Sequence, residues 1–126
     1  MKVLLGLLTA GMLFTVSGTA NAESIAYKDP RFGQQTVFVQ IEYKSRRSCE
    51  YLAGARRGAP EGAPYRQYQL PVTVFVGRDG PCHPTAQRLR ANKTVFVNLA
   101  QHDVKLFFIA PNGRVLSTES MAITER

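Results

Sequence analysis

Apolar and polar residues alternate most clearly over residues 36–44, where the sequence reads TVFVQIEYK. The apolar residues of one face are Val37, Val39, Ile41 and Tyr43. A period of two residues is typical of a strand that is buried on one side. The tetrapeptide Thr-Val-Phe-Val occurs again at 73–76 and 94–97, and its β-branched and aromatic residues favour strands there as well.

The same pattern predicts further strands over 70–76, 95–99, 104–108 and 114–119. Pro71 lacks a backbone N–H, so its strand either starts there or lies at the edge of the sheet. The last two strands are separated by Pro-Asn-Gly-Arg at 111–114, and Asn-Gly tolerates the positive φ angles of a tight turn. A C-terminal β-hairpin is therefore expected.

Two segments between these strands are predicted to be short helices. Ser48 is a suitable N-cap for the first, and Gly58 would end it. The residues that would share one face of this helix are Cys49, Leu52 and Ala53. The second helix is expected over 84–91, between Pro84 and the terminator Asn92.

We therefore expect an α+β fold, in which one or two short helices cover one face of a small, mainly antiparallel sheet. The alternative is an all-β sandwich in which the two segments are loops. Connections rich in proline and glycine, such as residues 58–65, keep this alternative open.

The N-terminal 22 residues have the pattern of a secretory signal peptide. Lys2 precedes an apolar stretch over 3–16, and Ala20-Asn21-Ala22 matches a cleavage site for signal peptidase. We expect cleavage after Ala22, one domain over 23–126, and a periplasmic or secreted location. Nothing after residue 22 is apolar for long enough to suggest a transmembrane segment.

The chain has only two cysteines, Cys49 and Cys82. Because export leads to an oxidising compartment, we predict that they form one intramolecular disulfide.

The composition is basic, with a formal net charge of +7, to which Lys2 contributes one. Candidate binding residues are the arginines Arg46, Arg47, Arg56, Arg57, Arg88 and Arg90. A basic surface suits an anionic or protein partner, such as an envelope protein, a cell-wall polymer or lipopolysaccharide. Nucleic acid is a further anionic partner of this kind.

Several phenylalanines fall opposite the valine face of their strands. They are Phe38, Phe75, Phe96 and Phe107. If helices cover the valine face, the first three would line an open sheet face that binds rings or bases. The alternative is that the hairpin or residues 25–33 fold over these rings and bury them in a second layer.

No catalytic, metal-binding or cofactor motif is recognised. Cys82-His83-Pro84-Thr85 lacks the second cysteine of a redox pair, and nothing in the spacing brings His83 and His102 together. The sequence therefore favours a non-enzymatic accessory or binding protein of the cell envelope that presents a basic surface to its partner. A secretion or conjugation apparatus is one setting for such a protein. Two alternatives remain, namely a small secreted hydrolase or toxin acting on nucleic acid or cell wall, and an inhibitor or immunity protein for a secreted enzyme.

Overall fold

The computed structural model describes residues 23–126, and the predicted signal peptide lies outside the described residues. This part of the chain forms a seven-stranded sheet, with a single 3-10 turn, η2, at Pro30–Phe32. The strands are β2 (Ile25–Lys28), β3 (Thr36–Ser45), β4 (Glu50–Arg57), β5 (Gln69–Arg78), β6 (Gln87–Phe96), β7 (Asp103–Ile109) and β8 (Val115–Glu125). The fold is thus nearly all-β, and the α+β prediction is wrong.

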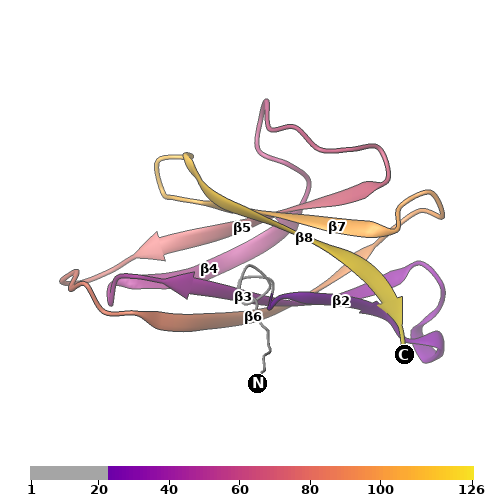
Figure 1. Ribbon diagram of the computed structural model, residues 1–126, viewed down its shortest axis with the longest axis horizontal. Coiled ribbons are helices and arrows are strands. Elements are labelled where there is room, and N and C mark those ends of the chain that lie inside the picture. Colours follow the sequence, from indigo (N-terminus) through magenta and orange to yellow (C-terminus); the bar gives the residue numbers. More distant parts are fainter. Residues whose placement is uncertain (1–22) are drawn as a thin grey trace, which may run out of the picture.

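The strands are hydrogen-bonded in the order β4-β5-β7-β8-β2-β3-β6, and the sheet curls into a flattened, nearly closed barrel (Figure 1). Strands β4, β5, β7 and β8 form one half, and β2, β3 and β6 form the other. Strand β8 joins the two halves, because it pairs with β7 over 115–122 and with β2 over 123–125. The β5–β7 and β2–β8 pairs are parallel, and the other pairs are antiparallel.

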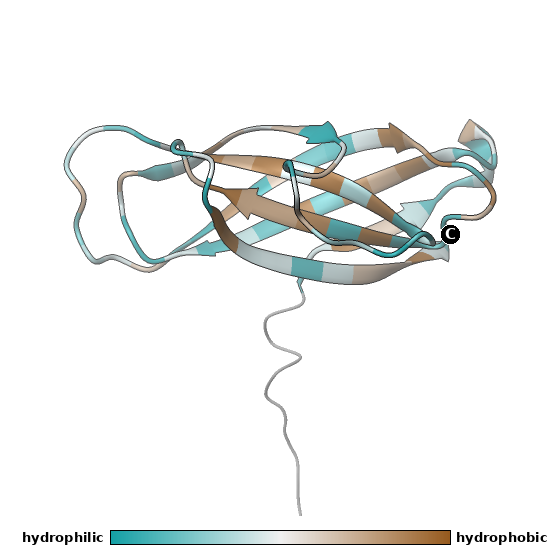
Figure 2. Ribbon diagram, turned by 90° about the horizontal axis from the view of Figure 1, so that it is seen from above, coloured by the Kyte–Doolittle hydropathy of each residue, from teal (hydrophilic) through white to brown (hydrophobic). Residues whose placement is uncertain are grey.

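The core lies between the two halves and is made of the inward residues of the alternating strands (Figure 2). The predicted valine face of the first long strand is buried as expected, since Val37, Val39 and Ile41 are each at most 1% exposed. Valines and leucines of β5 and β7 oppose them, including Val72, Val74 and Leu106. The alternation read from the sequence therefore identifies the core.

The first predicted helix is strand β4, which pairs with β5 along its whole length. A β-bulge between Leu52 and Gly54 inserts Ala53 as an extra residue. The bulge places the core-facing residues Leu52 and Ala55 three positions apart, a spacing that is also typical of a helix. This coincidence, together with helix-favouring alanine, leucine and arginine, explains the wrong prediction.

The second predicted helix is the first half of strand β6, which pairs with β3 residue by residue from Gln87 to Phe96. Its side chains alternate between exposed and half-buried, with Leu89 and Ala91 turned inward between exposed arginines. Tertiary pairing with β3 overrides the helix propensity of these residues. The predicted strand at 95–99 therefore begins earlier than expected and stops at Phe96, so that Leu99 is 80% exposed.

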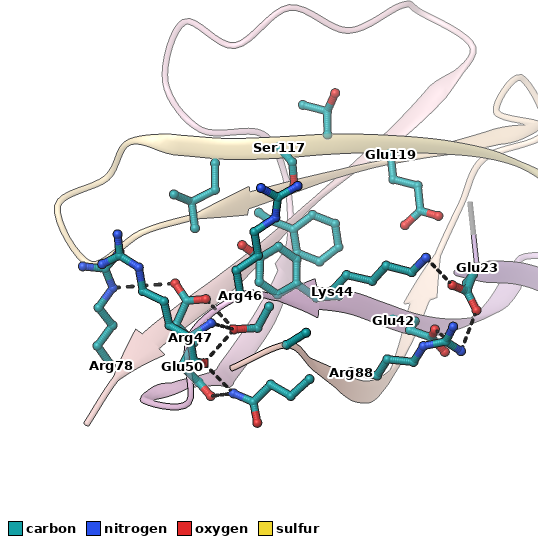
Figure 3. Close-up of a pocket in the computed structure, with 17 residues that line it drawn as sticks. Glu23, Glu42, Lys44, Arg46, Arg47, Glu50, Arg78, Arg88, Ser117 and Glu119 are labelled. Atoms are coloured by element: carbon teal, nitrogen blue, oxygen red, sulfur yellow. Dashed lines mark hydrogen bonds and ion pairs between the residues drawn. The ribbon is translucent and has the colours of Figure 1, made fainter. Parts of the chain in front are cut away.

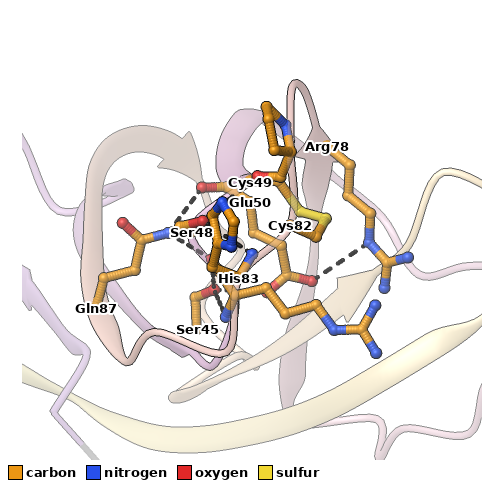
Figure 4. Close-up of a disulfide and its surroundings, with 10 residues drawn as sticks. Ser45, Ser48, Cys49, Glu50, Arg78, Cys82, His83 and Gln87 are labelled. Atoms are coloured by element: carbon orange, nitrogen blue, oxygen red, sulfur yellow. Dashed lines mark hydrogen bonds and ion pairs between the residues drawn. A yellow bond between two sulfur atoms is a disulfide. The ribbon is translucent and has the colours of Figure 1, made fainter.

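The predicted disulfide between Cys49 and Cys82 is confirmed, with the two Cα atoms 4.7 Å apart. It joins the β3–β4 connection to the β5–β6 connection (Figure 4). The same corner is held by the Ser48 amide, which donates to the carbonyl of His83 at 3.0 Å, and by the Gln87 side chain, which donates to the carbonyl of Arg47 at 2.7 Å. No helix within residues 23–126 is long and apolar enough to cross a membrane.

Candidate binding cleft between strands β3 and β8

The cleft exists because strand β2 is much shorter than the strands on either side of it. It has 4 residues, whereas β3 has 10 and β8 has 11. In its pairing with β3, the first pair is Ile25 with Gln40. In its pairing with β8, the first pair is Ala26 with Ile123. Beyond these points no strand of residues 23–126 lies between β3 and β8, and a cleft of about 1060 Å³ is found there (Figure 3).

The floor of the cleft is apolar. The rings of Tyr43 on β3 and Phe108 on β7 pack with their centroids 4.8 Å apart, and Leu116 of β8 lies beside them. Burial raises the pKa of the Tyr43 hydroxyl, and the nearby Glu50 carboxylate acts in the same direction. Tyr43 therefore stays neutral across the physiological pH range.

The end of the cleft next to β2 is lined by paired charges. Glu23 contacts the ammonium of Lys44 at 3.0 Å and a guanidinium nitrogen of Arg88 at 3.0 Å. The hydrogen bond with Lys44 lowers the pKa of Glu23, and Arg88 adds to the effect. Arg88 also lies 3.4 Å from the carboxylate of Glu42. The carboxylate of Glu119 accepts a hydrogen bond from the backbone amide of Ser24 at 3.2 Å. Carboxylates and cations are roughly balanced here.

The opposite end of the cleft, near the disulfide, is basic. Arg46 and Arg47 lie here and are exposed, and among residues 23–126 neither forms an ion pair. Arg78 contacts the buried carboxylate of Glu50 at 3.6 Å, and the hydroxyl of Ser45 donates to the same carboxylate at 2.6 Å. This end of the cleft thus carries a surplus of positive charge.

The six arginines singled out from the sequence do not form one surface. Arg46, Arg47 and Arg88 line the cleft, and Arg90 lies just outside it, 3.1 Å from Glu42. Arg56 and Arg57 lie at the far end of β4 and do not line the cleft, to which β4 contributes only Glu50 among its residues. Arg56 covers the ring of Phe75 at 5.9 Å, and Arg57 borders a separate hollow of about 730 Å³.

The predicted phenylalanine face is also divided. Phe38 packs between Tyr27 and Phe32, at 5.5 and 5.2 Å between ring centroids, and is half-buried. Phe96 is 68% exposed on the neighbouring β6, whereas Phe75 lies on β5 in the other half of the barrel. The structure therefore does not bring Phe38, Phe75 and Phe96 together.

An outward ring is buried at Phe107, but the segment that covers it is the β4–β5 connection and not the hairpin or residues 25–33 that the sequence suggested. This ring points away from the core and is nevertheless 1% exposed. Lys105 stands 5.2 Å above it and donates to the carbonyl of Pro64, and Thr73 donates to the carbonyl of Gly58. The β4–β5 connection is therefore tied down across this face and makes a small second layer.

The two histidines lie at opposite ends of parallel strands. His83 follows the end of β5, and His102 precedes the start of β7. His102 stacks on Tyr68 at 4.7 Å and lies 3.2 Å from Asp103, while His83 is bound to Ser48 beside the disulfide. No group of three metal-ligating side chains occurs in the described part of the chain. A site built from both histidines is therefore ruled out by the topology.

Sequence reasoning missed the β8 wall of the cleft, including Leu116 and Glu119, because nothing in the pattern shows that β8 faces β3 across a gap. The only available signal was the Ser-Ile-Ala-Tyr segment at 24–27, which is too short to stand out as a strand. Comparisons with protein-family models, with curated proteins and with solved structures found no match. The functional argument therefore depends on the cleft itself.

Proposed function

We propose that this protein is an exported, non-enzymatic binding protein of the cell envelope, and that it holds a protein partner in the cleft between β3 and β8. The observation that carries the proposal is the pair Arg46 and Arg47, which are exposed at one end of an apolar-floored cleft and form no ion pair with an acidic residue in the described part of the chain. Unpaired cations beside apolar surface are typical of a surface that awaits a partner of opposite charge.

The charge distribution favours a protein over a uniformly anionic polymer. Glu23, Glu42 and Glu119 line the end of the cleft nearest β2. Lys44 and Arg88 balance these carboxylates, so a polyanion lying along the cleft would meet surplus positive charge only at the end with Arg46 and Arg47. A polypeptide can place an acidic residue at one end and neutral residues at the other.

The location in the envelope is proposed from the signal-peptide pattern of residues 1–22, together with a disulfide that suits an oxidising compartment. Partners of this kind include a component of a secretion or conjugation apparatus and a secreted enzyme that the protein inhibits.

The test is site-directed photocrosslinking in cells. A photoreactive phenylalanine at Ser117, in the wall of the cleft, should capture one envelope protein that mass spectrometry identifies, whereas the same probe at exposed Thr94 on β6 should not. Capture from Ser117 should fall strongly in Arg46→Glu/Arg47→Glu and persist in Arg56→Glu/Arg57→Glu, which makes the same charge change on β4. Equal loss in both double variants, or capture from both positions, would show that the cleft is not the binding site.

A further inference from the structure

The outer face of the sheet where β3 pairs with β6 carries aromatic rings that remain exposed. Phe96 of β6 is 68% exposed, and Phe32 of η2 is 57% exposed. The half-buried Phe38 of β3 packs edge-to-face against Phe32, with 5.2 Å between the ring centroids. Phe38 pairs with Thr94, which lies next to Phe96 on the same side of β6, so Phe38 and Phe96 are diagonal neighbours on this face. The three rings therefore share one surface, and none of them lines the cleft.

Uncharged polar side chains adjoin these rings. Gln40 of β3 pairs directly with Asn92 of β6, and both are exposed, as is Thr94. Because side chains alternate along a strand, these three lie on the same outer face as Phe38 and Phe96. Among residues 23–126, none of the three side chains forms a hydrogen bond. Their donors and acceptors are therefore available to a ligand.

The charged side chains that border this surface are paired with one another. Arg90 of β6 lies 3.1 Å from Glu42 of β3, its partner in the strand register. At η2, Arg31 lies 2.6 Å from Asp29. Lys93 alternates to the opposite face of β6. The surface is therefore close to neutral, although the whole chain carries a formal net charge of +7.

We propose that this surface, here called the outer β3–β6 face, binds a neutral glycan chain. A pyranose ring presents C–H groups on its two sides and hydroxyl groups around its edge. The C–H groups carry partial positive charge and suit the electron-rich face of an aromatic ring such as Phe96. The hydroxyl groups both donate and accept hydrogen bonds, as the side-chain amides of Gln40 and Asn92 do. This site is separate from the cleft and gives the protein a second ligand.

The composition of the outer β3–β6 face argues against other occupants. Nucleic acid brings a phosphate with each base, and the bordering cations on β6 and η2 are already paired with carboxylates. A further cation, Arg126, lies 3.9 Å above the ring of Tyr27 and covers that ring. An apolar protein or lipid surface would bury the amides of Gln40 and Asn92 without partners, which is costly.

The outer β3–β6 face is already formed in the protein without its ligand. Strands β3 and β6 have 10 residues each and pair over their whole length. Just beyond Phe96, the amide of Val97 donates to the carbonyl of Gln35 at 2.8 Å and fixes the end of the pair. A preformed surface loses little conformational entropy on binding, which favours a weakly interacting ligand such as a neutral sugar.

The experiment uses the exported protein in its disulfide-bonded form. Short linear oligosaccharides of glucose and of N-acetylglucosamine are the probes, and NMR titration measures their binding. We expect binding that shifts the resonances of residues 92–96 and that does not weaken with salt, because the face carries no net charge. Phe96→Ala should weaken binding about fivefold or more, as expected for the loss of one stacked ring. Tyr65→Ala, which removes another exposed ring on the β4–β5 connection, should change binding by less than about twofold.

A second variant separates a glycan from an apolar partner. Gln40→Ala/Asn92→Ala should weaken oligosaccharide binding about threefold or more, because the hydroxyl groups lose hydrogen-bond partners. The same change makes the face more apolar, so a partner bound by apolar contacts would bind as well or better.

Three results would overturn the inference. The first is that neither oligosaccharide binds, or that Phe96→Ala leaves binding unchanged. The second is salt-sensitive binding of single-stranded DNA that is lost in Phe96→Ala, which would assign the face to nucleic acid. The third is capture of a protein by the photoreactive probe at Thr94, which would assign the face to a protein partner. None of the oligosaccharide measurements depends on the cleft, so they succeed or fail separately from crosslinking at Ser117.

Discussion

The ring of Tyr51 lies across Gly77, its partner in the antiparallel pair of β4 and β5. A Cβ atom built on Gly77 would lie 2.6 Å from Cζ of Tyr51, far closer than two carbon atoms approach. Gly77 thus makes room for an aromatic ring that is itself 46% exposed. The pair stabilises a strand end near the disulfide, where the sheet turns.

We predict that Gly77→Ala destabilises the protein by about 1 kcal/mol, because the methyl group displaces the Tyr51 ring. In a Tyr51→Thr background the same change should be neutral or stabilising, since alanine restricts the unfolded chain more than glycine does. Urea unfolding of the four proteins gives the coupling energy. A cost for Gly77→Ala that is the same in both backgrounds would show that the ring is not the cause.

Outward-facing phenylalanines should differ sharply in their contribution to stability. Phe107→Ala should lower the free energy of unfolding by about 3–5 kcal/mol, because its ring is buried under the β4–β5 connection. Phe96→Ala should change it by less than about 0.5 kcal/mol, since that ring is 68% exposed. Chemical denaturation of both variants measures the difference, and similar values for the two would contradict the burial of Phe107.

The carboxylate of Glu50 is buried near the cleft and depends on the hydroxyl of Ser45, which donates to it at 2.6 Å. Ser45→Ala should destabilise by about 1.5–3 kcal/mol, because a buried charge loses a hydrogen bond. Ser117→Ala, at an exposed position in the same cleft, should have an effect below about 0.5 kcal/mol. Thermal unfolding measures the loss of stability in the two variants. If Ser45→Ala costs no more than Ser117→Ala, then Arg78 or water alone is enough to stabilise the buried Glu50 carboxylate.

The disulfide closes a loop across a sequence separation of 33 residues. Cys49→Ser/Cys82→Ser should therefore lower the free energy of unfolding by about 3–4 kcal/mol through the greater entropy of the unfolded chain. Guanidinium unfolding of the oxidised protein and the double variant measures this. Intact mass under non-reducing conditions verifies the bond first, because alkylation of both thiols without reductant would exclude it.

The carboxyl group of Asp29, just before η2, should have a pKa well below its ordinary value. The hydrogen bonds from the Arg31 side chain and amide hold the pKa of Asp29 at about 2, below its ordinary 3.8. A depressed carboxyl pKa stabilises the fold fully above the ordinary value, and this contribution is lost as the pH falls from about 4 toward 2. An NMR titration should show the low midpoint in the native protein and a higher one in Arg31→Ala, still below 3.8 because the amide of residue 31 continues to donate to the carboxylate. An unchanged midpoint in that variant would refute the role of the Arg31 side chain.

The core and most strands could be predicted from the sequence, because Val37, Val39 and Ile41 repeat with the period that a half-buried strand imposes. The helices could not be excluded in the same way. Leu52 and Ala55 acquire a helical spacing from a bulge, and β6 is specified by pairing with β3 across a long stretch of chain. Such pairing is a tertiary effect that local propensity does not contain.

The disulfide could be predicted because only one pairing of two cysteines exists within the chain. The binding site could be predicted only in part. Arg46, Arg47 and Arg88 were candidates by charge, but so were Arg56 and Arg57, and only the topology separates the two groups. The cleft itself arises from the difference in length between β2 and its neighbours, which is visible only once β8 is known to lie on the other side of β2.

The parallel pairing of β2 with β8 also constrains the order in which the chain assembles. Ala26 and Tyr27 pair with Ile123 and Thr124, at the far end of the chain. Synthesis delivers the N-terminus first, so β2 has no β8 partner until residues 123–125 have emerged. A chain truncated before residue 115 would lack the strand that joins the two halves of the barrel, and would leave β2 and β7 as exposed edges prone to aggregation. The sheet is therefore completed only in a chain that has been synthesised through β8.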